Sequence, residues 1–289
     1  MLNSHHLSQN IELALDARRG RRAVRLELDG QVVWAKRPRR SPGYTLYALQ
    51  RVTAAVLQIS PLRPPRVSRG AAGLHAEARR LDVLRQRGWP VPRVLGVTDR
   101  WLALEDNGAS LGTVVRKAPP DERLDTIRRT LTFLQSLHMQ GGWHGAAQIR
   151  NFTQFGSRIG LIDFEDDLEP VMPLVMRQAR DLLLFLMSAA RFAEDDHRIV
   201  QAMLADALHT ARPDVAAEVN AVGAKLVSAL RLLGPLSQWT GPDGRSVALL
   251  ARGFRDLLPV KVLDRGEPIA PRSLAVTPVD QRPATTRRG

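Results

Sequence analysis

The chain has 289 residues, of which 44% are hydrophobic, and it carries a formal net charge of +13. This length can bury a substantial core, and the absence of cysteine excludes disulfides and thiolate zinc sites. The amino-terminal residues lack a basic start followed by an apolar stretch, and no run of about 20 apolar residues occurs. We therefore expect a cytoplasmic protein without a secretory signal or a membrane-spanning helix.

The positive charge indicates an anionic partner and is concentrated at one end of the chain. Residues 1–70 hold 13 of the Lys and Arg residues but only four acidic residues. Nucleic acid, anionic lipid and a phosphorylated substrate would each complement such a surface. A generally arginine-rich composition, without any special partner, is the alternative explanation.

The first part of the chain predicts a mixed α+β region that ends near residue 106. Apolar residues alternate on both sides of Asp29-Gly30, which is typical of a β-hairpin with a tight turn. Residues 74–87 repeat apolar side chains at spacings of three and four and stop at Gly88, which predicts a helix. Short strands are expected at 91–95 and 101–104, followed by turn residues at 105–108.

The second part, residues 107–263, has helical periodicity. Apolar residues from position 121 onward share one face until Gly141-Gly142, and residues 178–193 are apolar on nearly every side, which predicts a buried helix. Further helices are expected at about 196–211, 214–233 and 245–257. Pro, Thr and Arg dominate residues 264–289, so we expect a disordered tail there.

The most informative pattern is WHGAAQIRNFTQFGSRIGLIDFEDD, which spans residues 143–167. His144-Gly145 opens a loop, Asn151 follows after five residues, and a short apolar run then ends at Asp163. Mg²⁺ prefers oxygen ligands, and a loop Asn with an Asp at a strand end supplies them. Taken singly, Asn151 is equally a turn residue and Asp163 a helix cap, so the information lies in the combination.

This combination resembles the catalytic and metal-binding segment of the protein-kinase-like superfamily. The similarity is greatest to the lipopolysaccharide (Kdo) kinase, Bud32-like and aminoglycoside phosphotransferase group, and it covers about residues 20–190. It implies a two-lobed α+β fold, with a small β-rich N-lobe that contains one main helix and a larger helical C-lobe. It also implies binding of ATP and Mg²⁺, with Asn151 and Asp163 as metal ligands and with His144, Asn151 and Asp163 as catalytic residues.

Two residues of the first part extend the resemblance. Lys36 resembles the strand lysine that contacts ATP phosphates, and Glu77 resembles the helix carboxylate that pairs with it. Their separation implies a basic and apolar insertion at residues 37–70. The plainer alternatives are a solvated lysine at a strand end and a surface glutamate that pairs with Arg79 or Arg80 along its helix.

Two further residues complete the expected site. Glu105, where the two parts of the chain meet, is a third candidate cofactor contact. Asp181 resembles the helix aspartate that holds the backbone of the catalytic loop in protein kinases, since an acid in an apolar helix is costly unless it is hydrogen-bonded. A helix N-terminal acid that is favoured by the helix dipole is the alternative for Asp181.

Two features depart from the family pattern. Ala146 stands where the family has the Asp that orients and deprotonates the acceptor, and residues 16–25 offer only Gly20 in place of a glycine-rich phosphate loop. In one reading the protein is a phosphotransferase acting on a lipopolysaccharide-type sugar, a small molecule or a protein hydroxyl, and an auxiliary residue assists. The auxiliary candidates are Gln148, Glu165, Asp166 and Asp167. In the other reading it is a pseudokinase that binds nucleotide and regulates.

The insertion supplies the candidate partner surface. Residues 44–60, from Tyr44 to Ser60, contain one charged residue, Arg51, and arginines flank them on both sides. We expect these residues to form a helix. An apolar helix flanked by arginines suits an anionic membrane surface, which would make the protein peripheral on the inner face of the membrane. Packing against the first part of the chain or against a partner subunit is the alternative. A nucleic-acid partner is less favoured, because only 5% of residues are aromatic.

Overall fold

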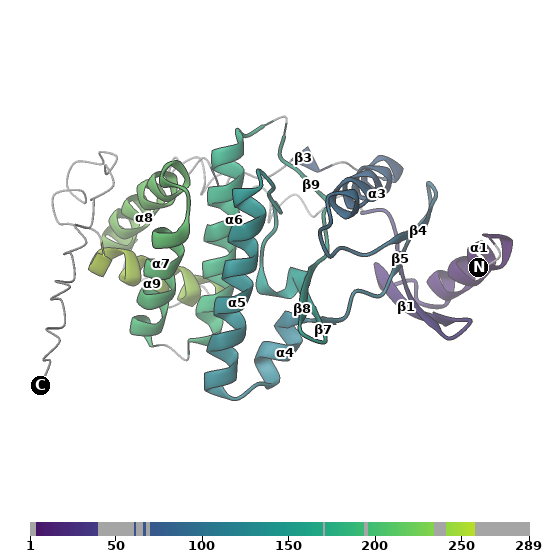
Figure 1. Cartoon of the computed structure of the whole chain (residues 1–289), viewed down its shortest axis with the longest axis horizontal. Coiled ribbons are helices and arrows are strands. Elements are labelled where there is room, and N and C mark those ends of the chain that lie inside the picture. The colour runs from purple at the N-terminus through teal and green to yellow at the C-terminus, as the bar shows by residue number, and fades with distance from the viewer. Residues whose placement is uncertain are drawn as a thin grey trace, which may run out of the picture.

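The computed structural model describes residues 4–39, 61, 66–67, 70–169, 171–193, 196–233 and 241–257. The protein is an α+β molecule, as expected. A small antiparallel sheet with two helices forms one end, and longer helices form the other (Figure 1). No described helix combines the length and the apolar character that crossing a membrane requires. The expected helix at 44–60 and the expected tail at 264–289 lie outside the described residues.

The sheet at the amino-terminal end has four strands in the order β1-β2-β5-β4. These strands are β1 (Ala23–Leu28), β2 (Gln31–Lys36), β5 (Leu102–Glu105) and β4 (Val94–Val97). The predicted hairpin is confirmed: Leu28 pairs with Gln31, and the intervening Asp29 and Gly30 have φ values of 50° and 73°. Two successive positive φ angles define the tight turn for which Asp-Gly is favoured.

Two helices pack on this sheet. Helix α1 (Ser4–Ala17), which the sequence reading missed, buries Leu7, Ile11 and Leu15 in a small apolar cluster with the sheet. Helix α3 (Ala71–Gln86) confirms the helix predicted at 74–87, although it begins three residues earlier. Its apolar positions are buried as the spacing indicated, and Gly88, with a φ of 82°, follows its end. The same buried face of α3 also carries a charged residue, Glu77.

The rest of the chain supplies two small sheets and the long helices. The small sheets pair β3 (Arg66–Val67) with β9 (Asp166–Asp167), and join β6 (Ala109–Ser110), β7 (Phe152–Phe155) and β8 (Arg158–Leu161). The helices are α4 (Leu111–Lys117), α5 (Pro120–Met139), α6 (Leu174–Ala189), α7 (His197–Thr210), α8 (Pro213–Leu233) and α9 (Gly241–Leu257). Short 3₁₀ turns occupy Ile149–Asn151 and Ala190–Phe192.

The helices predicted near 121, 196–211, 214–233 and 245–257 are present as α5, α7, α8 and α9, with small shifts at their ends. The helix predicted at 178–193 is displaced. It begins at Leu174, directly after Pro173, and passes into a 3₁₀ turn after Ala189. Proline suits the start of a helix, and this boundary lies outside the apolar run that defined the expectation. Asp181 therefore lies in the middle of α6 and not in its first turn.

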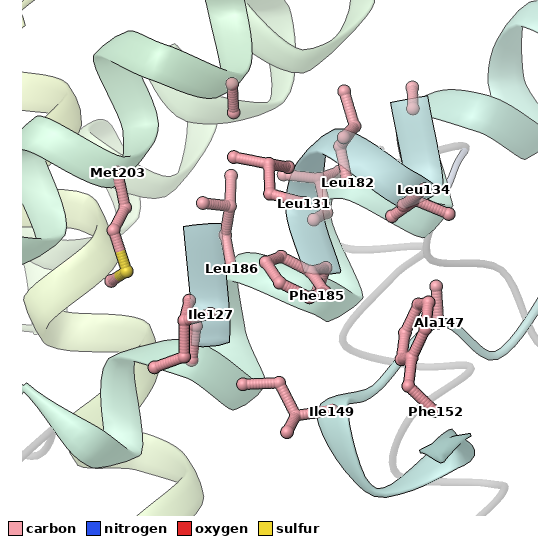
Figure 2. Close-up of a cluster of buried hydrophobic side chains, with 14 of the residues drawn as sticks. Ile127, Leu131, Leu134, Ala147, Ile149, Phe152, Leu182, Phe185, Leu186 and Met203 are labelled. Carbon is pink, nitrogen blue, oxygen red and sulfur yellow. The ribbon is translucent and has the colours of Figure 1, made fainter. Parts of the chain in front are cut away.

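A continuous hydrophobic core connects the long helices to the loop at residues 144–151. Figure 2 shows side chains of α5 and α6 packed together, with Ile149 and Phe152 from the loop and β7 beneath them. Phe152 and Phe185 are fully buried and meet edge to face, with ring centroids 5.8 Å apart. Each such side chain contributes about 1.5–3 kcal/mol through burial. The core thereby fixes the inner side of the loop.

Close helix packing at the carboxyl-terminal end predicts a contrast between two glycines. A Cβ on Gly223 of α8 would overlap the buried ring of Phe254, whereas a Cβ on Gly253 of α9 would lie 3.6 Å from its nearest neighbour. We expect Gly223→Ala to lower the free energy of unfolding by about 1–3 kcal/mol through overpacking. Gly253→Ala should be neutral or stabilising, because alanine favours helix. Urea denaturation followed by circular dichroism checks this, and equal effects would contradict it.

Candidate functional site

The site is built around an ion pair between the sheet and α3. Lys36 is the last residue of β2, and its Nζ lies 2.7 Å from Oε1 of Glu77, whose side chain is 1% exposed. A buried carboxylate is costly unless it is paired, so this contact ties α3 to the sheet. Lys36 is thus not a solvated lysine, and Glu77 pairs across the fold and not with Arg79 or Arg80. The two plainer sequence alternatives are wrong.

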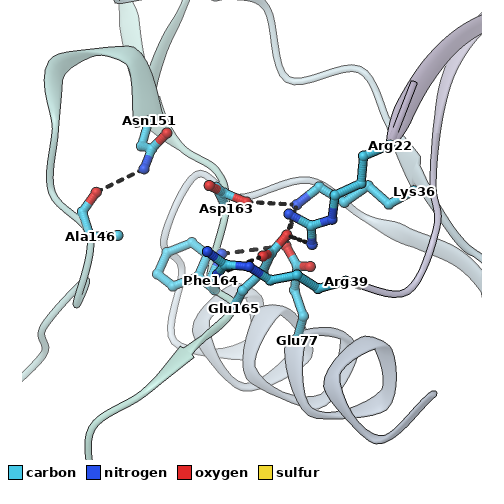
Figure 3. A network of polar contacts seen from close by, with 9 residues as sticks. All are labelled: Arg22, Lys36, Arg39, Glu77, Ala146, Asn151, Asp163, Phe164 and Glu165. Atoms are coloured by element: carbon cyan, nitrogen blue, oxygen red, sulfur yellow. Dashed lines mark hydrogen bonds and ion pairs between the residues drawn. The ribbon is translucent and has the colours of Figure 1, made fainter. Parts of the chain in front are cut away.

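The same ammonium group contacts two further carboxylates (Figure 3). Nζ of Lys36 lies 3.0 Å from Oδ1 of Asp163 and 3.4 Å from Oε1 of Glu165. Burial by itself lowers the pKa of Lys36, but the three carboxylates outweigh it and hold that pKa well above its usual value. Burial likewise raises the pKa of Asp163, and the charge of Lys36 reverses this and holds it well below the usual range. Both groups are therefore charged at neutral pH.

The chain bends sharply at Asp163, immediately after β8. Asp163 has a φ of 72°, a left-handed conformation that few residues other than glycine adopt and that aspartate tolerates better than most. The next residue, Phe164, is buried, and its backbone N–H donates to Oε1 of Glu77 at 3.3 Å. Two adjacent side chains therefore lie in different environments: Asp163 contacts Lys36, while Phe164 packs into the core. Non-glycine residues in this conformation concentrate at functional sites.

Glu165 lies among cations. It pairs with Arg22 and Lys36, and Arg39 lies 3.6 Å from its Oε2. Burial and the nearby Asp163 carboxylate raise the pKa of Glu165, although Lys36 opposes them. The contacts of Glu165 are therefore with the cations beside β2, and not with the 144–151 loop, where an acceptor-assisting residue was sought. Asp166 and Asp167 form β9, which pairs with β3.

A second buried carboxylate holds the 144–151 loop. Asp181 of α6 is fully buried; its Oδ2 accepts the backbone N–H of His144 and its Oδ1 that of Gly145, both at 2.6 Å. Nε2 of His138 lies 3.2 Å from Oδ2. Burial raises the pKa of Asp181, but the hydrogen bond and charge of His138, together with the hydrogen bond from the His144 backbone, outweigh it and lower that pKa. Its mid-helix position excludes the role of a helix N-terminal acid.

The other side of the loop is held by Arg80 of α3. Its guanidinium donates to the backbone oxygens of Trp143 and His144 at 2.9 and 3.1 Å and lies 3.6 Å from the centroid of the Trp143 ring. Sequence reasoning weighed Arg80 only as a surface partner of Glu77. Arg80 follows Glu77 by three residues, and this spacing places two side chains next to each other on a helix surface. The spacing was therefore the sign in the sequence that Arg80 lies near the site.

His144 is a buried, uncharged residue. Its ring stacks on Phe164 with centroids 4.5 Å apart, and burial lowers the pKa of His144 to about 4, although Asp181 partly opposes this. Its Nε2 has no hydrogen-bond partner among the described residues. Predicted as a catalytic residue, His144 lies in the core beneath the loop, where it packs against Phe164 and supports the bend at Asp163.

Asn151 lies beside the bend at Asp163. The backbone oxygen of Asn151 accepts the N–H of Ile162 at 3.0 Å, and its side-chain Nδ2 donates to the backbone oxygen of Ala146 at 2.8 Å. Figure 3 shows Asn151 and Ala146 together on one side of the cluster formed by Lys36 and its carboxylate partners. Because Nδ2 is committed to the loop, Oδ1 is the atom that remains to meet a ligand. The Ala146 side chain, a methyl group, offers no acid or base.

Glu105 is not part of this cluster. It ends β5 opposite Val33, whereas Lys36 pairs with Leu102 at the other end of the strand. Oε2 of Glu105 instead lies 3.1 Å from Nε of Arg93. The neighbouring Asn107, which sequence reasoning treated only as a turn residue, donates to Thr153 at 3.2 Å and so ties the first part of the chain to β7.

The donor set fits a hard divalent cation. Carboxylate oxygens of Glu77, Asp163 and Glu165 lie within 4.8 Å of one another. The buried Oε2 of Glu77 has no hydrogen-bond partner among the described residues. Asn151, whose backbone oxygen accepts the N–H of Ile162, offers an amide oxygen. Mg²⁺ is bound in proteins by one or two carboxylates together with other oxygens, so these residues could hold it.

Comparison of the chain with protein-family models and with curated proteins found no match. The interpretation of the site therefore rests on its residues and their geometry.

We expect Asp181→Asn to lower the free energy of unfolding by about 2 kcal/mol at pH 7, because charge-assisted bonds to the loop are weakened. The folded-state pKa of Asp181 is depressed, so its contribution is present above the unfolded pKa of about 4 and is lost as the pH falls through the folded value. In urea denaturation the difference from wild type should be constant from pH 7 to about pH 5 and should shrink as the pH falls below about 4. Asp125→Asn, which removes an exposed i,i+4 pair, is the control and should change little.

Proposed function

We propose that the protein is an ATP- and Mg²⁺-binding phosphotransferase with a two-lobed protein-kinase-like fold. One observation carries this proposal: the ammonium of Lys36 joins the buried Glu77, 41 positions away, and Asp163 at the strand end. If Lys36, Glu77 and Asp163 were surface residues that water solvates separately, they would not need to meet at one point. A strand lysine held by a helix carboxylate beside a metal-binding aspartate is the arrangement on which phosphoryl transfer from ATP depends.

In this proposal the cations beside β2 bind the phosphates. Lys36, Arg22 and Arg39 surround the Glu165 carboxylate, which is itself an anionic group. A triphosphate offers these cations several anionic oxygens, and arginine forks match phosphate geometry well. These contacts compensate for the missing glycine-rich loop, since charge replaces backbone N–H groups. Asp163 and Asn151 would hold Mg²⁺, which neutralises charge on the phosphates.

Catalysis in this proposal comes from positioning. Asp181 and Arg80 hold the loop backbone from two sides, so the loop is rigid where the acceptor hydroxyl would approach. The bond from the terminal phosphorus to ADP breaks, a bond to the acceptor oxygen forms, and the hydroxyl proton passes to water. Phosphoryl transfer has a loose transition state that needs little base catalysis, so placement and charge contribute most of the rate.

A second candidate function is favoured by Ala146. Without a carboxylate at this position the acceptor has no fixed hydrogen-bond acceptor on the loop, which lowers the rate of transfer. A protein that binds ATP without transferring its phosphoryl group would act as a nucleotide-dependent regulator. The phosphate and metal contacts are the same in both candidates, so they differ only in turnover.

Thermal shift with ATP and Mg²⁺ tests the shared binding step. A ligand at 100 times its dissociation constant stabilises a protein by about 2.7 kcal/mol, so the melting temperature should rise. We expect Asp163→Asn to abolish most of this rise, because it removes a charged metal ligand. Asp99→Asn, an equivalent change at a carboxylate that is 83% exposed, should retain it. If the melting temperature of the wild type does not change when ATP and Mg²⁺ are added, the proposal is refuted.

Replacement of Ala146 separates the two functions. Ala146→Asp restores a carboxylate on a loop that is otherwise held in place, so we expect ATP consumption to rise by about 10²-fold if transfer is the activity. The wild type should consume ATP above the level of the Asp163→Asn variant. Normal ATP binding with no turnover in the wild type would leave the regulator as the function.

A further inference from the structure

A cavity of about 440 Å³ adjoins the 144–151 loop, and none of its lining residues belongs to the Lys36 cluster. This volume is within the range of small-molecule sites. Four arginines from separate elements line the cavity together with two polar residues of the loop and α6. The charged and polar lining residues are Arg116, Arg123, Arg150, Arg191, Gln148 and Ser188.

The charge of this cavity is of one sign. None of the described residues that line it is Asp or Glu. Arg116 and Arg150 are exposed and make no ion pair with any described residue. The charges of Arg116 and Arg150 are therefore not compensated by a described carboxylate, and an anion with several oxygens could pair with both. Guanidinium groups in such a cluster bind phosphate bidentately.

The cavity wall is held in place by the fold. The hydroxyl of Ser110 donates to the backbone oxygen of Arg150 at 2.8 Å, and the backbone of Ile149 donates to Ser188 at 2.9 Å. A Cβ on Gly112 would lie only 3.1 Å from Cα of Arg150, so the absence of a side chain there lets α4 approach the loop. The backbone that carries Arg150 is therefore fixed by α4 and α6, which is typical of a preformed site.

We propose that this cavity binds a phosphate group carried by the acceptor, so that the acceptor substrate is itself phosphorylated. The inference rests on the proposed transferase function. Gln148 and Arg150 belong to the same loop as Ala146, and Asn151 bonds to the Ala146 backbone. An acceptor held through its phosphate in the cavity would present a hydroxyl near Ala146. Four arginines would then position the acceptor, which is the role that the missing aspartate leaves open.

Isothermal titration with inorganic pyrophosphate, without Mg²⁺, tests the anion site directly. The double variant Arg116→Gln/Arg150→Gln should bind pyrophosphate about tenfold more weakly or worse, since it removes two charged partners. Arg128→Gln/Arg129→Gln removes the same charge from the exposed face of α5 and should bind as the wild type does. Equal binding by the cavity variant and its control would overturn the proposal.

The source of the phosphate is separated by flotation with phosphatidylglycerol vesicles. Flotation that the cavity variant loses and its control retains identifies a phosphate borne by a lipid headgroup. Equal flotation of both, with pyrophosphate binding lost only in the cavity variant, identifies a soluble phosphorylated molecule. Equal flotation together with equal pyrophosphate binding contradicts the proposal.

The cavity variant also distinguishes this inference from the proposed function. Its melting temperature should still rise with ATP and Mg²⁺, because Lys36 and Asp163 are unchanged. If the wild type shows no such rise but binds pyrophosphate through the cavity arginines, the transferase proposal fails and the anion site survives without an acceptor role. If the rise is present and the cavity arginines do not affect pyrophosphate binding, only the acceptor inference fails.

Discussion

The ammonium group of Lys36 is the interaction on which the site depends. It draws together a strand end, a helix face and the bend after β8, which the chain otherwise keeps far apart. Without this cation, Glu77, Asp163 and Glu165 would place three negative charges within 4.8 Å of one another. Their mutual repulsion would open the site. In the function proposed above, the cluster would exchange these internal partners for phosphate oxygens and a divalent cation.

The loop at residues 144–151 is held rigid by a different set of interactions. Asp181 holds its backbone N–H groups from α6, and Arg80 holds its carbonyl groups from α3. Both anchors are charged and both meet backbone atoms, so side chains of the loop can change without loss of its shape. The loop can therefore carry alanine at position 146 while its backbone geometry persists. Under the function proposed above, binding and transfer would be physically separable.

Much of the fold could be predicted from local pattern. The Asp29-Gly30 turn specified the hairpin, because this pair adopts two positive φ angles at low cost. The apolar spacing in α3 specified its buried face. Helix α1 was missed although Leu7, Ile11 and Leu15 recur at a helical spacing of four residues. The short elements α4 and β6 were missed because so few residues give little periodic signal. The start of α6 was misplaced, because Pro173 and not the apolar run sets it.

For the site, residue type and order along the chain were enough to select the candidate residues, which are Lys36, Glu77, Asn151, Asp163 and Asp181. Which of these candidates contact one another could be seen only in the folded structure. It brought Glu165 to the cations of Lys36, Arg22 and Arg39, buried His144, excluded Glu105 and gathered four arginines into one cavity. Order along a chain constrains local conformation, whereas long-range contacts depend on how separate elements pack. Charges that are distant in sequence therefore reveal their partners only in the fold.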